Sequence, residues 1–63
     1  MKIFRIDYYN SNFRNRVLKQ SNGWSMIELR REDTYHKFTN ANTGDQIIES
    51  ITSCRVTIEE EDK

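Results

Sequence analysis

Apolar and polar residues alternate at both ends of this chain, with the repeat of two that is typical of β-strands. In residues 2–9, Phe4, Ile6 and Tyr8 occupy alternate positions and would share one face of a strand. In residues 53–59, every second residue is again apolar and polar residues fill the positions between them. The pattern predicts a strand at each end of the chain, each with one face toward a core.

Between these strands, the clearest local signal is Asn22-Gly23, which separates two apolar stretches. A type I′ turn needs positive φ at both central residues, and Asn and Gly adopt it most readily. We therefore predict a two-residue hairpin turn that joins a strand over residues 16–21 to a return strand over residues 24–31.

Residues 12–20 also fit a short helix. Phe13, Val17 and Leu18 fall on one helical stripe, and Asn12 is a good residue to cap the first turn. Two turns of helix are marginal without tertiary contacts, so the strand is the preferred interpretation and the helix is the alternative.

The second half of the chain continues with β character, interrupted by turn-forming residues. Residues 35–40 have the pattern of a strand, and the Asn- and Gly-containing residues 40–45 predict a longer turn. Residues 46–59 predict one long strand or two short ones, with a bend near residues 50–52. Residues 59–63 form a charged end that we expect to fray.

Five short strands separated by turns predict a mostly β fold, a single small domain covering residues 1–63. The strands could form an antiparallel meander or an SH3-like barrel. In a barrel, the first strand would pair with the last, and both open edges would be covered. The residues that would then meet are Phe4, Ile6 and Tyr8 with Cys54, Val56 and Ile58.

The composition limits how this fold can be stabilised. With 63 residues, 35% hydrophobic and 32% charged, the chain has room for one thin core. Cys54 is the only cysteine, so no internal disulfide can form, and a lone Cys with a lone His cannot complete a four-ligand zinc site. We expect no metal and no cofactor. The free thiol, with no signal peptide and no membrane-length apolar run, favours a cytoplasmic protein without membrane contact.

Cys54 and His36 are the residues best suited to nucleophilic catalysis. Cys54 falls on the apolar side of its predicted strand, where a cysteine behaves as a small hydrophobe. A chain this short also has little room to enclose a substrate pocket. The sequence therefore predicts that the protein is not an enzyme.

Charge is distributed unevenly, although the net charge is zero. Residues 1–37 hold eight Lys and Arg against four Asp and Glu, a balance of +4, whereas residues 38–63 hold two against six, a balance of −4. Folding could superimpose the two halves and cancel the charge, or leave a basic patch and an acidic tail. The Ile- and Asn-rich, Ala-poor composition is compatible with a phage or mobile-element origin.

Basic and aromatic residues are interleaved in the first half, and two kinds of binding surface use this chemistry. Basic sheet faces with aromatic side chains bind single-stranded nucleic acid, while Trp and Arg are enriched at protein–protein hot spots. The pI of about 6.6 is low for a nucleic-acid-binding domain, which favours a protein partner. The predicted binding residues are Trp24 as the anchor, with Tyr9, Phe13, Arg14, Arg16, Arg30 and Arg31.

The sequence thus predicts a non-enzymatic protein-binding module that acts as a regulator or inhibitor of a larger protein. Single-stranded nucleic-acid binding through the same residues is the alternative, and a structural role in a homo-oligomer such as a homodimer is the third reading. Steep salt dependence would distinguish nucleic-acid binding from a protein interface that depends mainly on Trp24.

Overall fold

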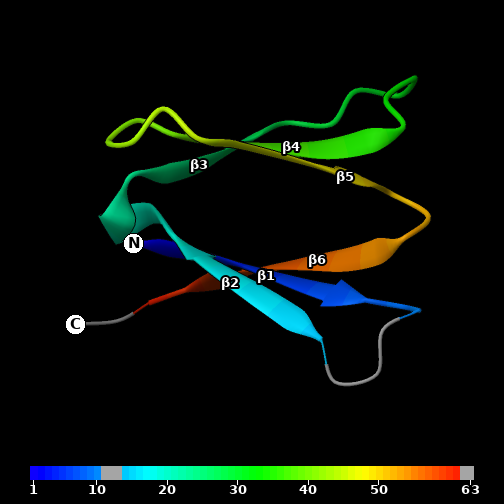
Figure 1. Ribbon diagram of the computed structural model, residues 1–63, viewed down its shortest axis with the longest axis horizontal. Helices are drawn as coiled ribbons and strands as arrows, with labels where there is room; N and C mark the ends of the chain where they lie inside the picture. Colours follow the sequence, from blue (N-terminus) through cyan, green and yellow to red (C-terminus); the bar gives the residue numbers. More distant parts are fainter. Residues whose placement is uncertain (11–13, 62–63) are drawn as a thin grey trace.

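A computed structural model describes residues 1–10 and 14–61 of the chain, and strands dominate it. The described residues form two three-stranded antiparallel sheets, which lie face to face (Figure 1). The mostly β class is confirmed, but the sheets are open and do not close into a barrel. The elements are β1 (Lys2–Tyr8), β2 (Asn15–Lys19), the 3₁₀ turn η1 (Gln20–Asn22), β3 (Trp24–Ile27), β4 (Tyr35–Asn40), β5 (Gln46–Ser50) and β6 (Cys54–Glu60).

The first sheet has the order β2-β1-β6, so the first and last strands are neighbours. Directly opposed residues in an antiparallel pair point to the same face, and the alternation of both strands places their apolar residues on the inner one. The pairing of the chain ends that was expected for a barrel is present in the open sheet: Phe4 lies opposite Ile58, Ile6 opposite Val56, and Tyr8 opposite Cys54.

The predicted hairpin at Asn22-Gly23 is wrong. Gly23 does adopt the positive φ that the dipeptide favours, 102°, but it ends the turn η1, which carries the chain from one sheet to the other. The segment before it, β2, pairs with β1, and the segment after it, β3, pairs with β4. An Asn-Gly pair specifies a local backbone geometry and not the partner of either strand, and two facing sheets bury more apolar surface than one hairpin.

Two further expectations change in the same region. Residues 15–19 are a strand, so the helical alternative is wrong for them, while residues 12 and 13 lie outside the described residues. The return strand stops at Ile27 instead of reaching residue 31, because residues 28–34 form a loop before β4. The predicted bend near residues 50–52 is found as the turn between β5 and β6.

The core between the two sheets is small. The rings of Phe4 and Phe38 face each other across the layers with centroids 6.0 Å apart and a tilt of 56°. Phe38 and Ile6 are fully buried. The other buried apolar residues are Leu18 and Cys54, and the partly buried residues packed around them are Tyr8, Trp24, Met26, Ile47 and Val56.

One corner of the molecule, where η1 meets the β4–β5 loop, is held by asparagine side chains. Asn40 is buried; its Oδ1 accepts the backbone N–H groups of Asn42 (2.8 Å) and Thr43 (3.1 Å), and its Nδ2 donates to the carbonyl of Asn22 (3.2 Å). A Cβ on Gly23 would lie 2.7 Å from Asn40 Oδ1. We call these five residues the asparagine corner; it fixes where β3 starts.

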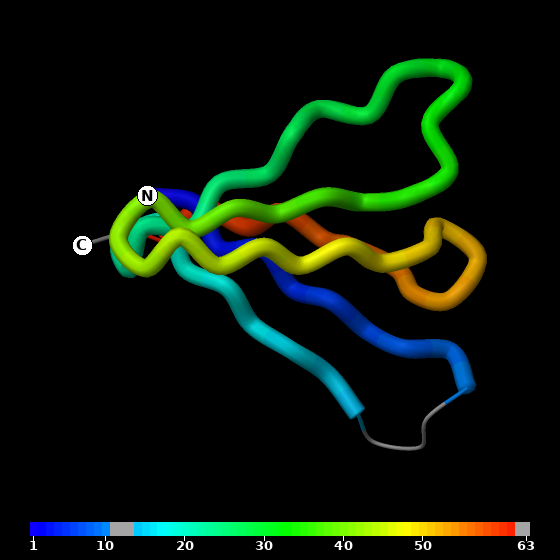
Figure 2. Tube along the Cα trace, turned by 45° about the horizontal axis from the view of Figure 1, so that its top comes forward, coloured from blue at the N-terminus to red at the C-terminus, as the bar shows by residue number. Residues whose placement is uncertain are grey.

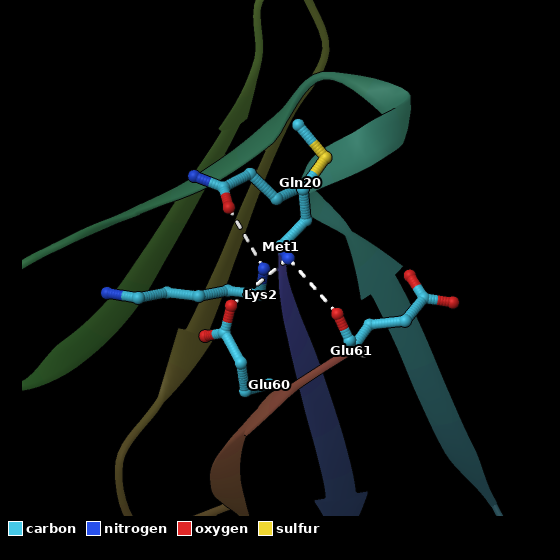
Figure 3. A network of polar contacts seen from close by, with 5 residues as sticks. All are labelled: Met1, Lys2, Gln20, Glu60 and Glu61. Atoms are coloured by element: carbon cyan, nitrogen blue, oxygen red, sulfur yellow. Dashed lines mark hydrogen bonds and ion pairs between the residues drawn. The ribbon is translucent and has the colours of Figure 1, made fainter. Parts of the chain in front are cut away.

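The two ends of the described chain meet beside η1 (Figure 3). The terminal amine of Met1 lies 3.1 Å from a carboxylate oxygen of Glu60 and donates to the carbonyl of Glu61 (3.2 Å). The backbone N–H of Lys2 donates to Oε1 of Gln20 in η1 (2.9 Å). The start of β1 is therefore tied to the end of β6 and to the turn between the sheets.

Candidate functional site

A groove of about 470 Å³ lies between the two sheets where they fail to close. Phe4 and Ile58 supply apolar surface from the first sheet. Met26 supplies it from β3, and Leu29 from the loop that follows β3. Ile58 and Leu29 are 49% and 40% exposed, so the groove is open to solvent. The remaining lining residues are polar: Lys2, Gln20, Ser25 and Glu28.

The groove has this shape because β6 and β3 are outer strands of their sheets. β6 pairs only with β1, and β3 only with β4, among the described strands. Ile58 points to the inner face of its sheet, as Phe4 does, but the second sheet does not cover it. Apolar side chains that face inward and stay half exposed mark a place where a further element can pack.

Charge at the groove is divided between its two ends. Lys2 belongs to the start of β1, next to η1, and Glu28 follows β3 at the opposite end. The acids of β6 are partly engaged nearby: Glu59 pairs with Arg5 at 2.8 Å and Glu60 with the Met1 amine. The hydrogen bond and charge of Glu59 raise the pKa of Arg5. The groove therefore presents one positive end and one negative end around an apolar floor.

Trp24, the predicted anchor, is the first residue of β3 and packs half-buried against the core. It lies opposite Asn40 at the asparagine corner, and it is not among the residues that line the groove. Trp24 therefore contributes to the core, and its exposed surface is limited.

Four other predicted residues come to the opposite end of the molecule, which we call the loop end. Backbone hydrogen bonds link the segments at this end. The N–H of Ile51 donates to the carbonyl of Thr34 (3.0 Å), that of Tyr9 to the carbonyl of Ser53 (3.0 Å), and that of Tyr8 to the carbonyl of Arg14 (3.4 Å). The 28–34 loop, the 51–53 turn and the end of β1 lie at the same end of the molecule in Figures 1 and 2, with the turn between the other two. The predicted residues found there are Tyr9, Arg14, Arg30 and Arg31.

The side chains at the loop end are mostly exposed. Tyr9 is 60% exposed, and the guanidinium of Arg14 lies over the Tyr8 ring, 5.6 Å from its centroid. Arg30 pairs with Asp33 at 3.7 Å. Arg16 is exposed on β2, opposite Ile6, and Phe13 lies outside the described residues.

The groove residues were missed by sequence reasoning. Leu29 was placed in a long return strand, and Ile58 and Phe4 were assigned to the core. Alternation shows which residues share a face, but it does not show whether the opposing sheet covers that face. Strand pairing between residues far apart in the chain is needed to find this groove.

The residues considered for catalysis lack the properties of an activated pair. Cys54 is buried, its Sγ donates to the carbonyl of Ser50 (3.6 Å), and burial raises the pKa of its thiol. Burial lowers the pKa of His36, whose Nδ1 is buried without a hydrogen-bond partner. Burial and the nearby Glu49 carboxylate raise the pKa of Tyr8. In residues 1–10 and 14–61, no group of three or more His, Cys, Asp or Glu side chains is placed to hold a metal ion.

A second apolar surface lies on the outer face of the β3-β4-β5 sheet. Ile27 and Ile48 flank Lys37 in one row across the three strands and are 49% and 53% exposed. This surface is flat and does not border the groove, so it provides a matched control for the groove residues.

Comparison with known proteins does not assign this chain to a family. No protein-family model, no curated protein and no solved structure matches this chain. The helical segment in the described part of the chain, η1, has three residues, and no helix there could cross a membrane.

Proposed function

We propose that this protein is a small, non-enzymatic protein-binding module that receives a partner in the groove between its sheets. The observation that supports it is the half-exposed apolar surface of Ile58 and Leu29, which line the groove together with buried Phe4. Covering such surface with a partner contributes roughly 25 cal/mol for each Å² removed from water. In the cell, the module would act as a cytoplasmic regulator or inhibitor of a larger protein.

The polar rim supports a protein partner over a small apolar ligand. Lys2, Gln20, Ser25 and Glu28 surround an apolar floor, which is the arrangement of an interface core with a polar rim. Ile58 and Leu29 in the groove are half exposed, whereas small-molecule sites bury most of their ligand.

A matched pair of isoleucines tests this proposal. Ile58→Ser removes a 49% exposed side chain from the groove, and Ile48→Ser removes a 53% exposed side chain from the outer face of the other sheet. The native protein and both variants are immobilised, incubated with nuclease-treated lysate, and their captured proteins are quantified.

We expect one stoichiometric protein to be captured by the native chain and by Ile48→Ser, with at least about a fivefold loss for Ile58→Ser. Equal capture by the two variants would contradict a groove-borne interface. Capture of nothing but the chain itself would replace the proposal with self-assembly.

Nucleic-acid binding at the loop end is a second candidate, and the distribution of charge favours it. Two acids of β6, Glu59 and Glu60, form their ion pairs beside the chain termini, away from the loop end. In the part of the chain that the structure describes, Arg16 and Arg31 form no ion pair. Arg31 at the loop end is thus available to phosphates, whereas its neighbour Arg30 pairs with Asp33.

The test is anisotropy of a labelled oligothymidine of about 20 nucleotides, followed against salt. Arg14→Ala should weaken binding and reduce the salt slope, because Arg14 is at the loop end. Lys19→Ala makes the same charge change at the end of β2 nearest η1, and should leave both quantities unchanged. Binding that is absent for the native chain at low salt would remove this candidate.

A further inference from the structure

We infer that the groove binds an extended peptide segment of the partner protein, which adds as an antiparallel strand to the free edge of β3. This inference rests on the proposed function and specifies the form and chemistry of the bound segment. Three features carry it: the direction of the β3 backbone groups, the apolar floor beneath them, and the opposite charges at the two ends of the groove.

The hydrogen-bond pattern shows which β3 groups are free. Ala41 N–H donates to the carbonyl of Gly23 at 2.9 Å, in line with the β3–β4 register. Bonded pairs alternate along an antiparallel ladder, so Ser25 and Ile27 also bond to β4. The N–H and C=O groups of Met26 therefore point away from β4, toward the edge that borders the groove.

The same alternation holds on the other strands, which supports the assignment. Asn40 N–H donates to Asp45 and Ile51 N–H to Thr34, so the even-numbered residues of β4 bond to β5 and the odd-numbered residues bond to β3. Glu28 follows the last residue of β3, and its N–H lies trans to the Ile27 carbonyl across their peptide bond, so it also points away from β4. Met26 and Glu28 thus offer an added strand two donors and one acceptor, the mode of peptide recognition known as β-augmentation.

The floor of the groove determines which side chain of the segment is buried. Met26 points to the inner face of its sheet, as its opposed residue Phe38 does. A peptide residue directly opposite Met26 would point to the same face and reach Phe4 and Ile58. That position takes an apolar side chain.

Antiparallel pairing, which is more stable per residue than parallel pairing, sets the direction of the segment, and the charges then determine its flanking residues. Glu28 comes two positions after Met26 and lines the groove, and Lys2 lines it near η1. A segment antiparallel to β3 would place a basic residue at Glu28, an apolar residue at Met26 and an acidic residue toward Lys2. Read from its N-terminus, the bound sequence is basic-x-apolar-x-acidic.

A second copy of this chain fits the groove less well than a partner segment. The inner-face apolar side chains of the described strands already pack in their own core, as Cys54 and Val56 of β6 do. A neighbouring copy could offer a strand edge, but the side chains needed for the floor would stay in their own core. Self-association is therefore an outcome that the test can detect and not the expected one.

The test uses the full chain and a blocked synthetic nonapeptide, Thr-Thr-Arg-Thr-Ile-Thr-Asp-Thr-Thr, with a control peptide in which Arg and Asp are exchanged. Amide resonances and hydrogen exchange of the chain are followed during titration by NMR. We expect slowed exchange at Met26 and Glu28, whose N–H groups are free, with little change at Ser25 and Ile27. The exchanged peptide should bind about two- to fivefold more weakly, the range for solvent-exposed ion pairs.

Glu28→Lys gives the reciprocal control. This variant should reduce the preference for the first peptide by a similar factor. No binding of either peptide, or binding that leaves Met26 and Glu28 exchange unchanged, would overturn strand addition. Capture of a folded partner that depends on Ile58 but not on these amides would leave the proposed function standing and reject this mode alone. A concentration-dependent dimer that protects the same amides would identify a second copy as the occupant and overturn the inference.

Discussion

The asparagine corner and the groove both lie along β3, within a few residues of each other, and they differ in whether their polar groups are hydrogen-bonded within the chain. At the corner, buried Asn40 uses both ends of its amide in hydrogen bonds, and the backbone of Gly23 is packed against it. At the groove, the edge of β3 is unpaired and apolar side chains are half exposed. The corner satisfies its groups within the chain, whereas the groove leaves them for a partner.

This difference indicates where the sequence is constrained by folding and where it is available for binding. A buried polar group without a partner costs about 1–3 kcal/mol, so the corner tolerates little change. Half-exposed groove residues contribute less to folding, since much of their surface is already in water. Substitutions should therefore separate the two regions by their effect on stability.

The largest expected effect is at Gly23. Gly23→Ala places a Cβ 2.7 Å from Asn40 Oδ1 and from Asn42 Nδ2, at a φ of 102° that L-residues rarely adopt. We expect a loss of about 3 kcal/mol in the free energy of unfolding, from backbone strain and disrupted corner hydrogen bonds. Urea denaturation followed by Trp24 fluorescence measures it.

Gly44→Ala is the control for this substitution. Gly44 also has positive φ, 79°, but a Cβ there meets nothing within 4 Å. Its cost should be limited to strain of about 1–2 kcal/mol. A Gly23→Ala chain that does not fold, beside a folded Gly44→Ala chain, agrees with the expectation. Equal losses for the two variants would show that contacts at the corner add nothing.

The next effect is at Asn40. Asn40→Leu keeps a similar volume and leaves the backbone N–H groups of Asn42 and Thr43 without their acceptor. We expect a loss of about 2 kcal/mol in the free energy of unfolding. Asn42→Ala removes one exposed hydrogen bond to the same Asn22 carbonyl and should cost less than half as much. A larger loss at Asn42 would place the centre of the corner there instead.

The smallest effect concerns His36, which shares the inner face of β4 with Asn40 but has an unpartnered Nδ1. Burial lowers its pKa, so the unfolded chain binds a proton more readily. The stabilising contribution is therefore complete above the unfolded pKa of about 6.5 and is lost as pH falls below it. Glu49 lies directly opposite on β5, and Tyr8 is near that carboxylate.

Unfolding measured at pH about 7.5 and about 5.5 tests this sign. The native chain should be less stable at the lower pH, and His36→Gln should lose part of that dependence. A native chain that gains stability on acidification would show that the Glu49 charge outweighs burial at His36.

Alternation alone was enough to predict the strands at the two ends of the chain. Their pairing was expected only for a barrel, and the open sheets have it, with Phe4, Ile6 and Tyr8 opposite Ile58, Val56 and Cys54. Local signals were less informative about partners. Asn22-Gly23 correctly indicated positive φ at Gly23, but it could not reveal that the flanking strands belong to different sheets.

The candidate site was harder to predict, because it depends on what the second sheet leaves uncovered. Trp24 is a residue type that is enriched at hot spots, but it packs against the core. Ile58 alternates with polar residues as a core residue does, but it borders the groove. Both outcomes are set by contacts between strands distant in sequence. Arg30 and Arg31 were expected at the end of the return strand, and the structure has them in the loop that follows β3.

The pairing of β1 with β6 also affects how the chain can fold. The β1–β2 hairpin and the β3-β4-β5 meander join neighbouring strands, so each can form by closing short loops. β6 reaches β1 only by closing a loop that includes nearly the whole chain, and such distant contacts form slowly. Because Ile58 lies on β6, the groove cannot be complete before this distant pairing forms.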